Sequence, residues 1–398
     1  MGRIGLLIYS SIMGLVACTA RPDEKCHNEN KLLVYEKLRD INVNVIGKQY
    51  QHGAQQVIVE DTLLLYYALD IDRKKIDIYN LTNAAYKETV RLKSEGPDAV
   101  LGLSYMYVVS PDSIYLMASF SNSLYLINSE GKVVRKWLFN TSLPDSLRNS
   151  RYSAGTYTLL GLGQPEFFYV PFWVNKKGTE LRAIINYDNI YTDNRDFSYQ
   201  YSLSPIAHFN LVKNTFVKFT GKYPGLYLNS SRPHNALHRF VVVNNIDVLS
   251  FTSSDKVYCQ RNDTFICARS NYAPRSITLF REGDEQDEEA EINSYVTEGS
   301  YSGLIKDPYR RRIYRIYSHP QERLNLEGLQ NRKNETPWSI LILDYDGNMK
   351  GEVVFEKKKY DYFNVHVVPE GLLLSKENSS NPGNQEDLLE FDIIRIIE

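Results

Sequence analysis

Apolar and polar residues alternate in short runs along most of this chain, most clearly from Leu101 to Phe139. The turn-forming residues Ser, Pro, Asp, Asn and Gly separate four strand-like runs there, at 103–109, 113–118, 123–128 and 133–139. The second and third runs are apolar on both faces, which predicts a sheet covered on both sides. Since no neighbouring segment has a helical period, we expect copies of the same unit to cover it, as in the blades of a β-propeller.

The fourth run differs from the other three because charged residues interrupt it. Lys132, Arg135 and Lys136 lie among Val133, Val134 and Trp137. Charge on an outermost strand keeps an exposed sheet edge from pairing with another chain. The pattern therefore predicts a four-stranded blade whose last strand is the outer one.

Similar units recur along the rest of the chain, at 56–92, 157–224, 238–270, 303–356 and 364–396. Within the third unit we interpret the segment that contains RAIINYDNIYTDNRDF as an insertion. The last unit has three strand-like runs, and residues 31–46 can supply the fourth. We therefore expect an all-β fold, a single β-propeller over 31–398 with six blades (seven is the alternative). The N-terminal strand would close it by pairing with the C-terminal blade.

The N-terminus predicts export and lipid anchoring. Arg3 precedes an apolar run that is too short to span a bilayer, so 1–17 is interpreted as a signal peptide. Ala17 directly before Cys18 is similar to a bacterial lipobox, in which the cysteine carries the lipid anchor. Residues 18–30 would form a tether. The alternative is an ordinary secretory peptide, and the membrane face of the proposed outer-membrane location is left open.

Export allows disulfide bonds. Cys259 and Cys267 lie on two adjacent strand-like runs, so we predict a disulfide between them across a hairpin; two buried thiols are the alternative. Cys26 would then be unpaired in the tether. No histidine pair stands at ligand spacing near these cysteines, so we predict no metal site.

Composition supports an all-β protein and argues against one class of partner. The chain contains 30 tyrosines and 16 phenylalanines, residue types that favour strands. Its net charge is -2, whereas a nucleic-acid-binding domain would usually have a basic surplus. We therefore expect no nucleic-acid partner.

Sequence motifs for catalysis are absent, and we predict no cofactor. Four residues are candidates for ligand binding, each with a structural alternative. Arg232 and His234, in SSRPHNALH, could bind an anion or hold a loop. His319 follows a strand and could equally be a turn residue. Trp173, next to Phe172, could stack on a sugar or belong to the core.

Three short motifs could accept O-linked glycan. Each has an aspartate, then Ser or Thr, then an aliphatic residue, and the acceptors would be Thr62, Ser113 and Ser146. A turn residue that begins a strand explains each motif equally well.

The lipobox at Cys18, the SEGPDAVLGL lead-in before DSIYLMASFSNSLYLINSEGKVVRKW, and the blade RRIYRIYSHP…WSILILDYDGNMKGEVVFE together resemble one family. It comprises six-bladed β-propeller lipoproteins of unknown function from Bacteroides and relatives. The resemblance implies a propeller and an envelope location, but no catalytic residues. We expect an envelope protein that binds or scaffolds a glycan, a peptide or another envelope protein; a propeller hydrolase or lyase acting on carbohydrate is the alternative.

Overall fold

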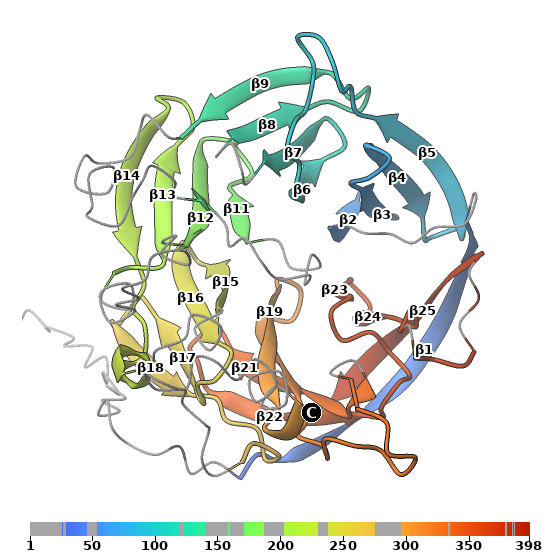
Figure 1. Ribbon diagram of the computed structural model, residues 1–398, viewed down its shortest axis with the longest axis vertical. Helices are drawn as coiled ribbons and strands as arrows, with labels where there is room; N and C mark the ends of the chain where they lie inside the picture. Colours follow the sequence, from blue (N-terminus) through green and yellow to red (C-terminus); the bar gives the residue numbers. More distant parts are fainter. Residues whose placement is uncertain are drawn as a thin grey trace, which may run out of the picture.

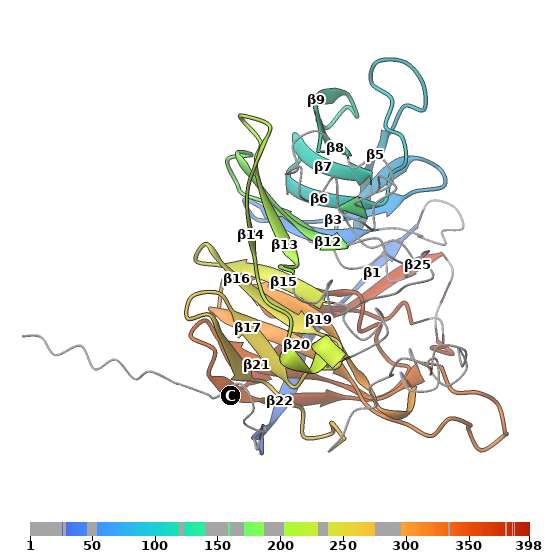
Figure 2. The same cartoon turned by 60° about the vertical axis from the view of Figure 1, so that its left-hand side comes forward.

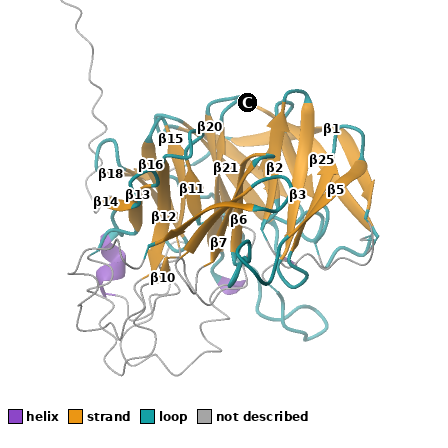
Figure 3. Ribbon diagram, turned by 90° about the horizontal axis from the view of Figure 1, so that it is seen from above, coloured by secondary structure: helices purple, strands orange, loops and turns teal. Residues whose placement is uncertain are grey.

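Sheets arranged in a circle make up the body of the protein, as Figure 1 shows face-on and Figure 3 from above. The computed structural model describes residues 26, 29–45, 54–118, 123–139, 158–159, 171–186, 203–229, 238–274, 296–332, 335–378, 380–383, 385 and 387–398. The all-β fold with a β-propeller arrangement is confirmed. Within these ranges, no helix has both the length and the apolar character needed to cross a membrane.

Four sheets contain four or five strands each. The first consists of β2 (Gln55–Glu60), β3 (Leu63–Asp70), β4 (Lys75–Asn80) and β5 (Ala85–Arg91). The second consists of β6 (Tyr105–Ser110), β7 (Ser113–Ala118), β8 (Ser123–Ile127) and β9 (Val133–Leu138). The third consists of β10 (Thr158–Leu159), β11 (Phe172–Val174), β12 (Glu180–Asn186), β13 (Ile206–Asn210) and β14 (Thr215–Thr220). The fourth consists of β15 (His238–Val243), β16 (Ile246–Phe251), β17 (Lys256–Cys259) and β18 (Thr264–Cys267).

The fifth sheet has eight strands, where we had expected two blades of four. In spatial order they are β19 (Ser300–Asp307), β20 (Arg312–Ser318), β21 (Trp338–Asp344), β22 (Met349–Phe355), β1 (Leu32–Asn44), β25 (Leu388–Ile397), β24 (Leu372–Ser375) and β23 (Val365–Val367). The long strand β1 causes the difference: Leu32 and Leu33 pair in parallel with β22, and the rest pairs antiparallel with β25. Figure 2 shows β1 running from β22 to β25.

The second sheet follows the hydrophobic pattern closely. Strands β7 and β8 are buried along both faces, as their two-sided apolar pattern predicts. Strand β9 is at the outer edge, and Arg135 and Lys136 are exposed there. Charged residues therefore mark the outer edge of this sheet, as expected.

The third sheet differs from the prediction, because residues 180–186 form strand β12 rather than part of an insertion. Arg182 interrupts the apolar pattern of this strand, yet its side chain is almost completely buried. Its guanidinium donates to Asp247 of the fourth sheet at 2.6 Å, and His208 donates to the same carboxylate at 3.0 Å. Burial alone would raise the pKa of Asp247, but hydrogen bonds from His208 and Thr220 and the charge of Arg182 outweigh it and lower the pKa.

The predicted disulfide between Cys259 and Cys267 is wrong: Cys267 is bonded to Cys26, with a Cα–Cα distance of 5.5 Å. The register of the hairpin explains this, since Cys259 pairs with Thr264 and Cys267 pairs with Lys256. The two cysteines thus lie three residues apart along the hairpin, a separation of about 10 Å. Cys259 is a free thiol.

The segment before β1 is attached to the sheets, although we had expected it to be a flexible tether. Besides the disulfide at Cys26, the Asn30 backbone N–H donates to Asn271 at 2.8 Å, and the Asn271 amide donates back to the Asn30 carbonyl at 2.9 Å. Asn271 also donates from its backbone N–H to the buried carboxylate of Glu352 in β22 at 2.9 Å. This segment therefore connects the fourth and fifth sheets.

Candidate functional site

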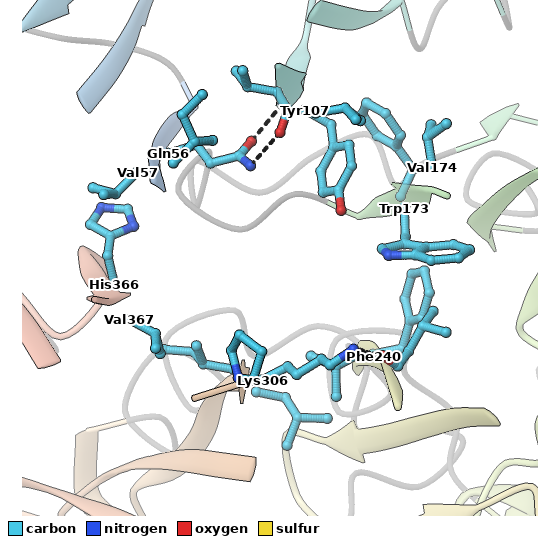
Figure 4. A pocket seen from close by; sticks show the side chains of 18 of the residues that line it. Gln56, Val57, Tyr107, Trp173, Val174, Phe240, Lys306, His366 and Val367 are labelled. Carbon is cyan, nitrogen blue, oxygen red and sulfur yellow. Dashed lines mark hydrogen bonds between the residues drawn. The ribbon is translucent and has the colours of Figure 1, made fainter. Parts of the chain in front are cut away.

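A cavity of about 640 Å³ lies at the centre of the circle of sheets (Figure 4). Its walls come from the strands nearest the centre, β2, β6, β11, β15, β19 and β23. The volume falls within the range typical of small-molecule sites. We call this space the central cavity and regard it as the candidate functional site.

A glutamine side chain organises one part of the wall. Gln56 in β2 donates from Nε2 to the carbonyl of Val108 at 2.9 Å, and its Oε1 accepts from the Val108 N–H at 2.7 Å (Figure 4). Val108 belongs to β6, the innermost strand of the second sheet. The amide thereby satisfies backbone groups that an inner strand edge would otherwise leave open, and it fixes β2 against β6.

A second set of polar side chains determines the tautomer of His366. Gln55 Oε1 accepts from the hydroxyl of Tyr66 at 2.6 Å and from Nδ2 of Asn364. Asn364 therefore turns its Oδ1 toward His366, 2.5 Å from Nε2. Nε2 must carry the proton, so Nδ1 is the acceptor nitrogen of the neutral imidazole. Burial lowers the pKa of His366 to about 4, which keeps the imidazole neutral at physiological pH.

Aromatic side chains form another part of the wall. Tyr107 from β6 points its hydroxyl into the central cavity, and Trp173 from β11 lies beside it (Figure 4). The guanidinium of Arg182 lies 5.1 Å from the centre of the Trp173 ring, a cation–π contact that holds the indole in place. Trp173, a sequence candidate, thus lines the central cavity. Phe172 beside it belongs to the same wall and is almost fully buried.

Three cationic side chains also line the central cavity: Lys176, Arg239 and Lys306. Lys306 donates from Nζ to the carbonyl of Val242 at 2.8 Å, which holds it along the wall. Burial, and then the nearby charge of Lys176, lower the pKa of Lys306. The residues described as lining this space include no aspartate and no glutamate.

His319, a second sequence candidate, does not line the central cavity. It is buried, its imidazole stacks on Tyr272 with centroids 4.1 Å apart, and its Nε2 lies 2.9 Å from Ser339 Oγ. The Ser339 hydroxyl donates to Glu352, so it must accept from His319. Histidine therefore does not act as a base on this serine, and the arrangement differs from a nucleophilic triad.

The remaining sequence candidates are not in the central cavity or are not described. Thr62 is exposed in the turn after β2, and Ser113 is half-buried at the start of β7. Arg232, His234, Ser146 and Cys18 lie outside the described residues. Among the residues that are described, no group of three His, Cys, Asp or Glu side chains could hold a metal ion.

Sequence reasoning missed Tyr107, Arg239, Lys306 and His366. They lie on four different inner strands, β6, β15, β19 and β23, so no local motif brings them together. A weak signal exists in retrospect: Lys306 and His366 interrupt the first strands of their units, GLIKDP and NVHVVPE, which are otherwise largely apolar. A polar residue in an inner strand marks a position that faces the centre.

One solved structure shares this architecture. A crystal structure of a DUF4221 family member from Bacteroides vulgatus superposes with a TM-score of 0.72 at 16% identity, covering 92% of this chain and 98% of that chain. A Bacteroides fragilis protein thought to be exported gives 0.49 at 11% identity, covering 92% and 100%; regucalcin, a calcium-binding protein from Agrobacterium tumefaciens, gives 0.40 at 12%, covering 91% and 94%. No curated protein matches. The model of the domain of unknown function DUF4221 matches residues 38–353, and the chain therefore belongs to the DUF4221 family.

Proposed function

We propose that this protein is a binding module of the cell envelope whose ligand, a glycan or a segment of peptide or protein, enters the central cavity. The observation that carries the proposal is the wall itself. Tyr107 and Trp173 present aromatic surface from two sheets, and His366 and Gln56 are held in place by hydrogen bonds. A largely apolar cavity with a few fixed polar groups is the usual form of a binding site.

Tryptophan fluorescence tests this proposal directly. The chain has three tryptophans. Two of them, Trp137 and Trp338, are at most 2% exposed and do not line the central cavity. A ligand in the central cavity should therefore change the emission of Trp173 alone. Trp173→Phe should abolish the change and Trp338→Phe should keep it. A ligand response that survives Trp173→Phe would place binding elsewhere.

The alternative is a hydrolase or lyase acting on carbohydrate, and one pair of carboxyl groups favours it. The backbone N–H of Asp361 donates to the carbonyl of Ser375 at 2.8 Å, and that of Glu377 donates to the Ser375 hydroxyl at 3.1 Å. Burial raises the pKa of Asp361 to about 7; burial and the charge of Asp361 raise that of Glu377 to about 7. Such groups could exchange protons near neutral pH. Oligosaccharide cleavage that disappears in Asp361→Asn would support this alternative over simple binding.

The envelope location rests on the N-terminal sequence, and we propose lipid attachment at Cys18 with anchoring in the outer membrane. Labelling cells with an alkyne analogue of palmitate tests it. The full-length protein and Cys259→Ser should carry the label, and Cys18→Ser should not. A label that persists in Cys18→Ser would exclude this anchor.

We also propose that the eight-stranded sheet counts as two blades, which gives a six-bladed propeller closed through β1. The support is that six inner strands line the central cavity, two of them, β19 and β23, from the eight-stranded sheet. Glycan attachment at Thr62, Ser113 or Ser146 remains a proposal, and Thr62 is the better placed of the two described residues because it is exposed. Mass spectrometry of the mature protein would locate any glycan.

A further inference from the structure

The segment between β20 and β21 contains a narrow hairpin that is held in shape by its own polar groups. The side-chain oxygen of Asn325 accepts from the backbone N–H groups of Glu327 and Leu329, each at 2.9 Å. Nearer the base, the Asn331 amide donates to the carbonyl of Glu322 at 2.7 Å and joins the two arms. Hydrogen bonds within the hairpin therefore fix its conformation.

Three leucines on this hairpin face solvent. Leu324, Leu326 and Leu329 are 50%, 108% and 61% exposed. Single exposed apolar residues are common on protein surfaces, but a group of them is typical of an interaction site. We call residues 324–329 the leucine tip.

The base of the hairpin adjoins the place where the N-terminal segment is attached to the sheets. His319, the first residue after β20, stacks on Tyr272 with centroids 4.1 Å apart. Tyr272 follows Asn271, which exchanges two hydrogen bonds with Asn30. The disulfide at Cys26 lies four residues before Asn30. The hairpin and the attached N-terminal segment are therefore on the same side of the protein.

Covalent geometry limits how far this side can lie from a membrane that holds the proposed anchor. Residues 19–25 separate Cys26 from Cys18, the residue for which we propose lipid attachment. The eight steps between the two cysteines span at most about 27 Å. The seven steps from His319 to Leu326 span about 23 Å when the arm of the hairpin is extended. Because the two lengths are similar, the leucine tip can reach the bilayer.

A bilayer suits the leucine tip better than a protein partner does. A protein interface of standard size takes about 20–30 residues from each partner, whereas the tip offers three apolar side chains. Lipid chains accept apolar side chains without a complementary shape. Glu327 is exposed within the tip, and its carboxylate opposes deep insertion because charge is costly in the bilayer core. The tip is therefore suited to shallow insertion.

Resting on the proposed lipid attachment at Cys18, we infer that the leucine tip docks on the surface of the same bilayer. Its three leucines enter the boundary between head groups and acyl chains, and Glu327 stays at the level of the head groups. A single flexible anchor leaves a protein free to turn above the membrane. A second point of attachment fixes the orientation of the propeller, and with it that of the central cavity.

Quenching of tryptophan fluorescence by brominated lipid tests this inference on the full-length, lipid-anchored protein. Leu326→Trp places an indole in the leucine tip. Tyr309→Trp is the matched control, because Tyr309 is 48% exposed and lies before β20, whereas the hairpin follows this strand. In vesicles of phosphatidylcholine with brominated acyl chains, Leu326→Trp should lose most of the emission that its added indole contributes in vesicles without bromine. Tyr309→Trp should lose none of its added emission, and equal quenching of the two variants would overturn the inference.

A second pair of variants assigns the contact to the leucines. In the Leu326→Trp protein, Leu329→Ser removes another apolar side chain and should shift the equilibrium away from the docked tip about tenfold, so that quenching falls. Val212→Ser is the control, because Val212 lies in the turn between β13 and β14 and is 60% exposed, close to the 61% of Leu329. It should leave the quenching unchanged. An equal effect of the two substitutions would contradict docking through the leucines.

The outcomes separate this inference from the proposed anchor. A protein that carries the palmitate label at Cys18 but shows no quenching of Leu326→Trp would overturn the docking and leave the anchor standing. Quenching in a protein without the label would support the docking and refute the anchor. Absence of both label and quenching would count against both proposals. A dimer that Leu329→Ser dissociates, found without quenching, would assign the leucine tip to contact between two copies of the chain instead.

Discussion

Arg182 and Asp247 form a buried ion pair between two sheets: Nη1 lies 2.6 Å from Oδ1, and both side chains are at most 2% exposed. Arg182 comes from β12 and Asp247 from β16, so the pair joins the third sheet to the fourth. Arg182 also covers Trp173. One guanidinium therefore contributes both to the contact between sheets and to the wall of the central cavity.

Replacing Asp247 should destabilise the protein strongly. Asp247→Asn removes one of the two carboxylates that pair with the buried Arg182 and leaves Glu180, which is 31% exposed, as the other. We expect this to cost about 3 kcal/mol of unfolding free energy, the lower end of the range for a broken buried pair. Urea denaturation measures it. The control is Asp346→Asn, whose carboxylate is 74% exposed and 3.7 Å from Arg261, and which should change stability by less than about 0.5 kcal/mol. Similar midpoints for the two variants would contradict this role of the pair.

The disulfide should connect the N-terminal segment to the fourth sheet. Peptide mapping without reduction should recover Cys26 linked to Cys267, and maleimide should label Cys259 after unfolding. Cys26→Ser should lower the unfolding free energy by about 2–5 kcal/mol, because the unfolded chain regains the freedom of a long closed loop. Cys259→Ser serves as the control and should leave stability nearly unchanged. A Cys259–Cys267 peptide would refute the pairing described here.

The Asp361 carboxyl should make stability depend on pH. Its folded pKa, about 7, lies above the unfolded value, so its contribution is fully present below about pH 4 and is lost as pH rises toward 7. Asp361→Asn cannot ionise and should gain about 1–2 kcal/mol relative to wild type between pH 5 and pH 8, a figure discounted for the solvent that reaches this half-buried group.

Thermal unfolding at the two pH values measures this difference. His319 and His366, whose pKa burial lowers to about 4, act in the opposite direction below pH 6.5, but they are common to both proteins and cancel. Asp346→Asn is again the control and should follow the wild type. A difference between Asp361→Asn and wild type that stays constant from pH 5 to pH 8 would argue against a raised pKa.

Comparing alanine variants of two glycines should distinguish the cost of backbone strain from the cost of a clash between sheets. Gly131 has φ +78°, and a Cβ there would lie 2.4 Å from the carbonyl oxygen of Arg91 in the neighbouring sheet. Gly96 has φ +82° and no atom within 4 Å of such a Cβ. Both alanine variants should lose about 1 kcal/mol through strain.

Gly131→Ala should lose about 1–3 kcal/mol more than Gly96→Ala, because the turn after β8 must move away from β5. Chemical denaturation of the two variants gives the difference. If both lose the same amount, the turn does not pack against the neighbouring sheet as closely as described.

Local patterns predicted most of the fold because each blade is built from neighbouring segments. The alternation in 101–139 gave all four strands of the second sheet, and β21 was predicted at 338–344, as found. The prediction failed where a residue far away in the sequence determines whether a side chain is buried or exposed. The local pattern predicts that Arg182 is a surface residue. In the structure it is buried, because it pairs with Asp247, 65 positions later.

The central cavity could not be predicted for the same reason. Of the two ligand-binding candidates that the structure describes, Trp173 lines it and His319 does not. Lys306 and His366 look like ordinary surface positions, and only the arrangement of the sheets brings them to one space. Similarly, the Cys26–Cys267 bond joins residues 241 positions apart, whereas local spacing favoured the nearer cysteine.

The bond at Cys26 also decides how the protein responds to mechanical load. A strand pulled from its free end peels away one hydrogen bond after another, which requires little force. Tension applied upstream of Cys26 instead passes through a covalent link into β18, so β1 is not peeled from β22 and β25. Under reducing conditions the same tension would reach β1 directly, and the sheet that β1 completes would open first.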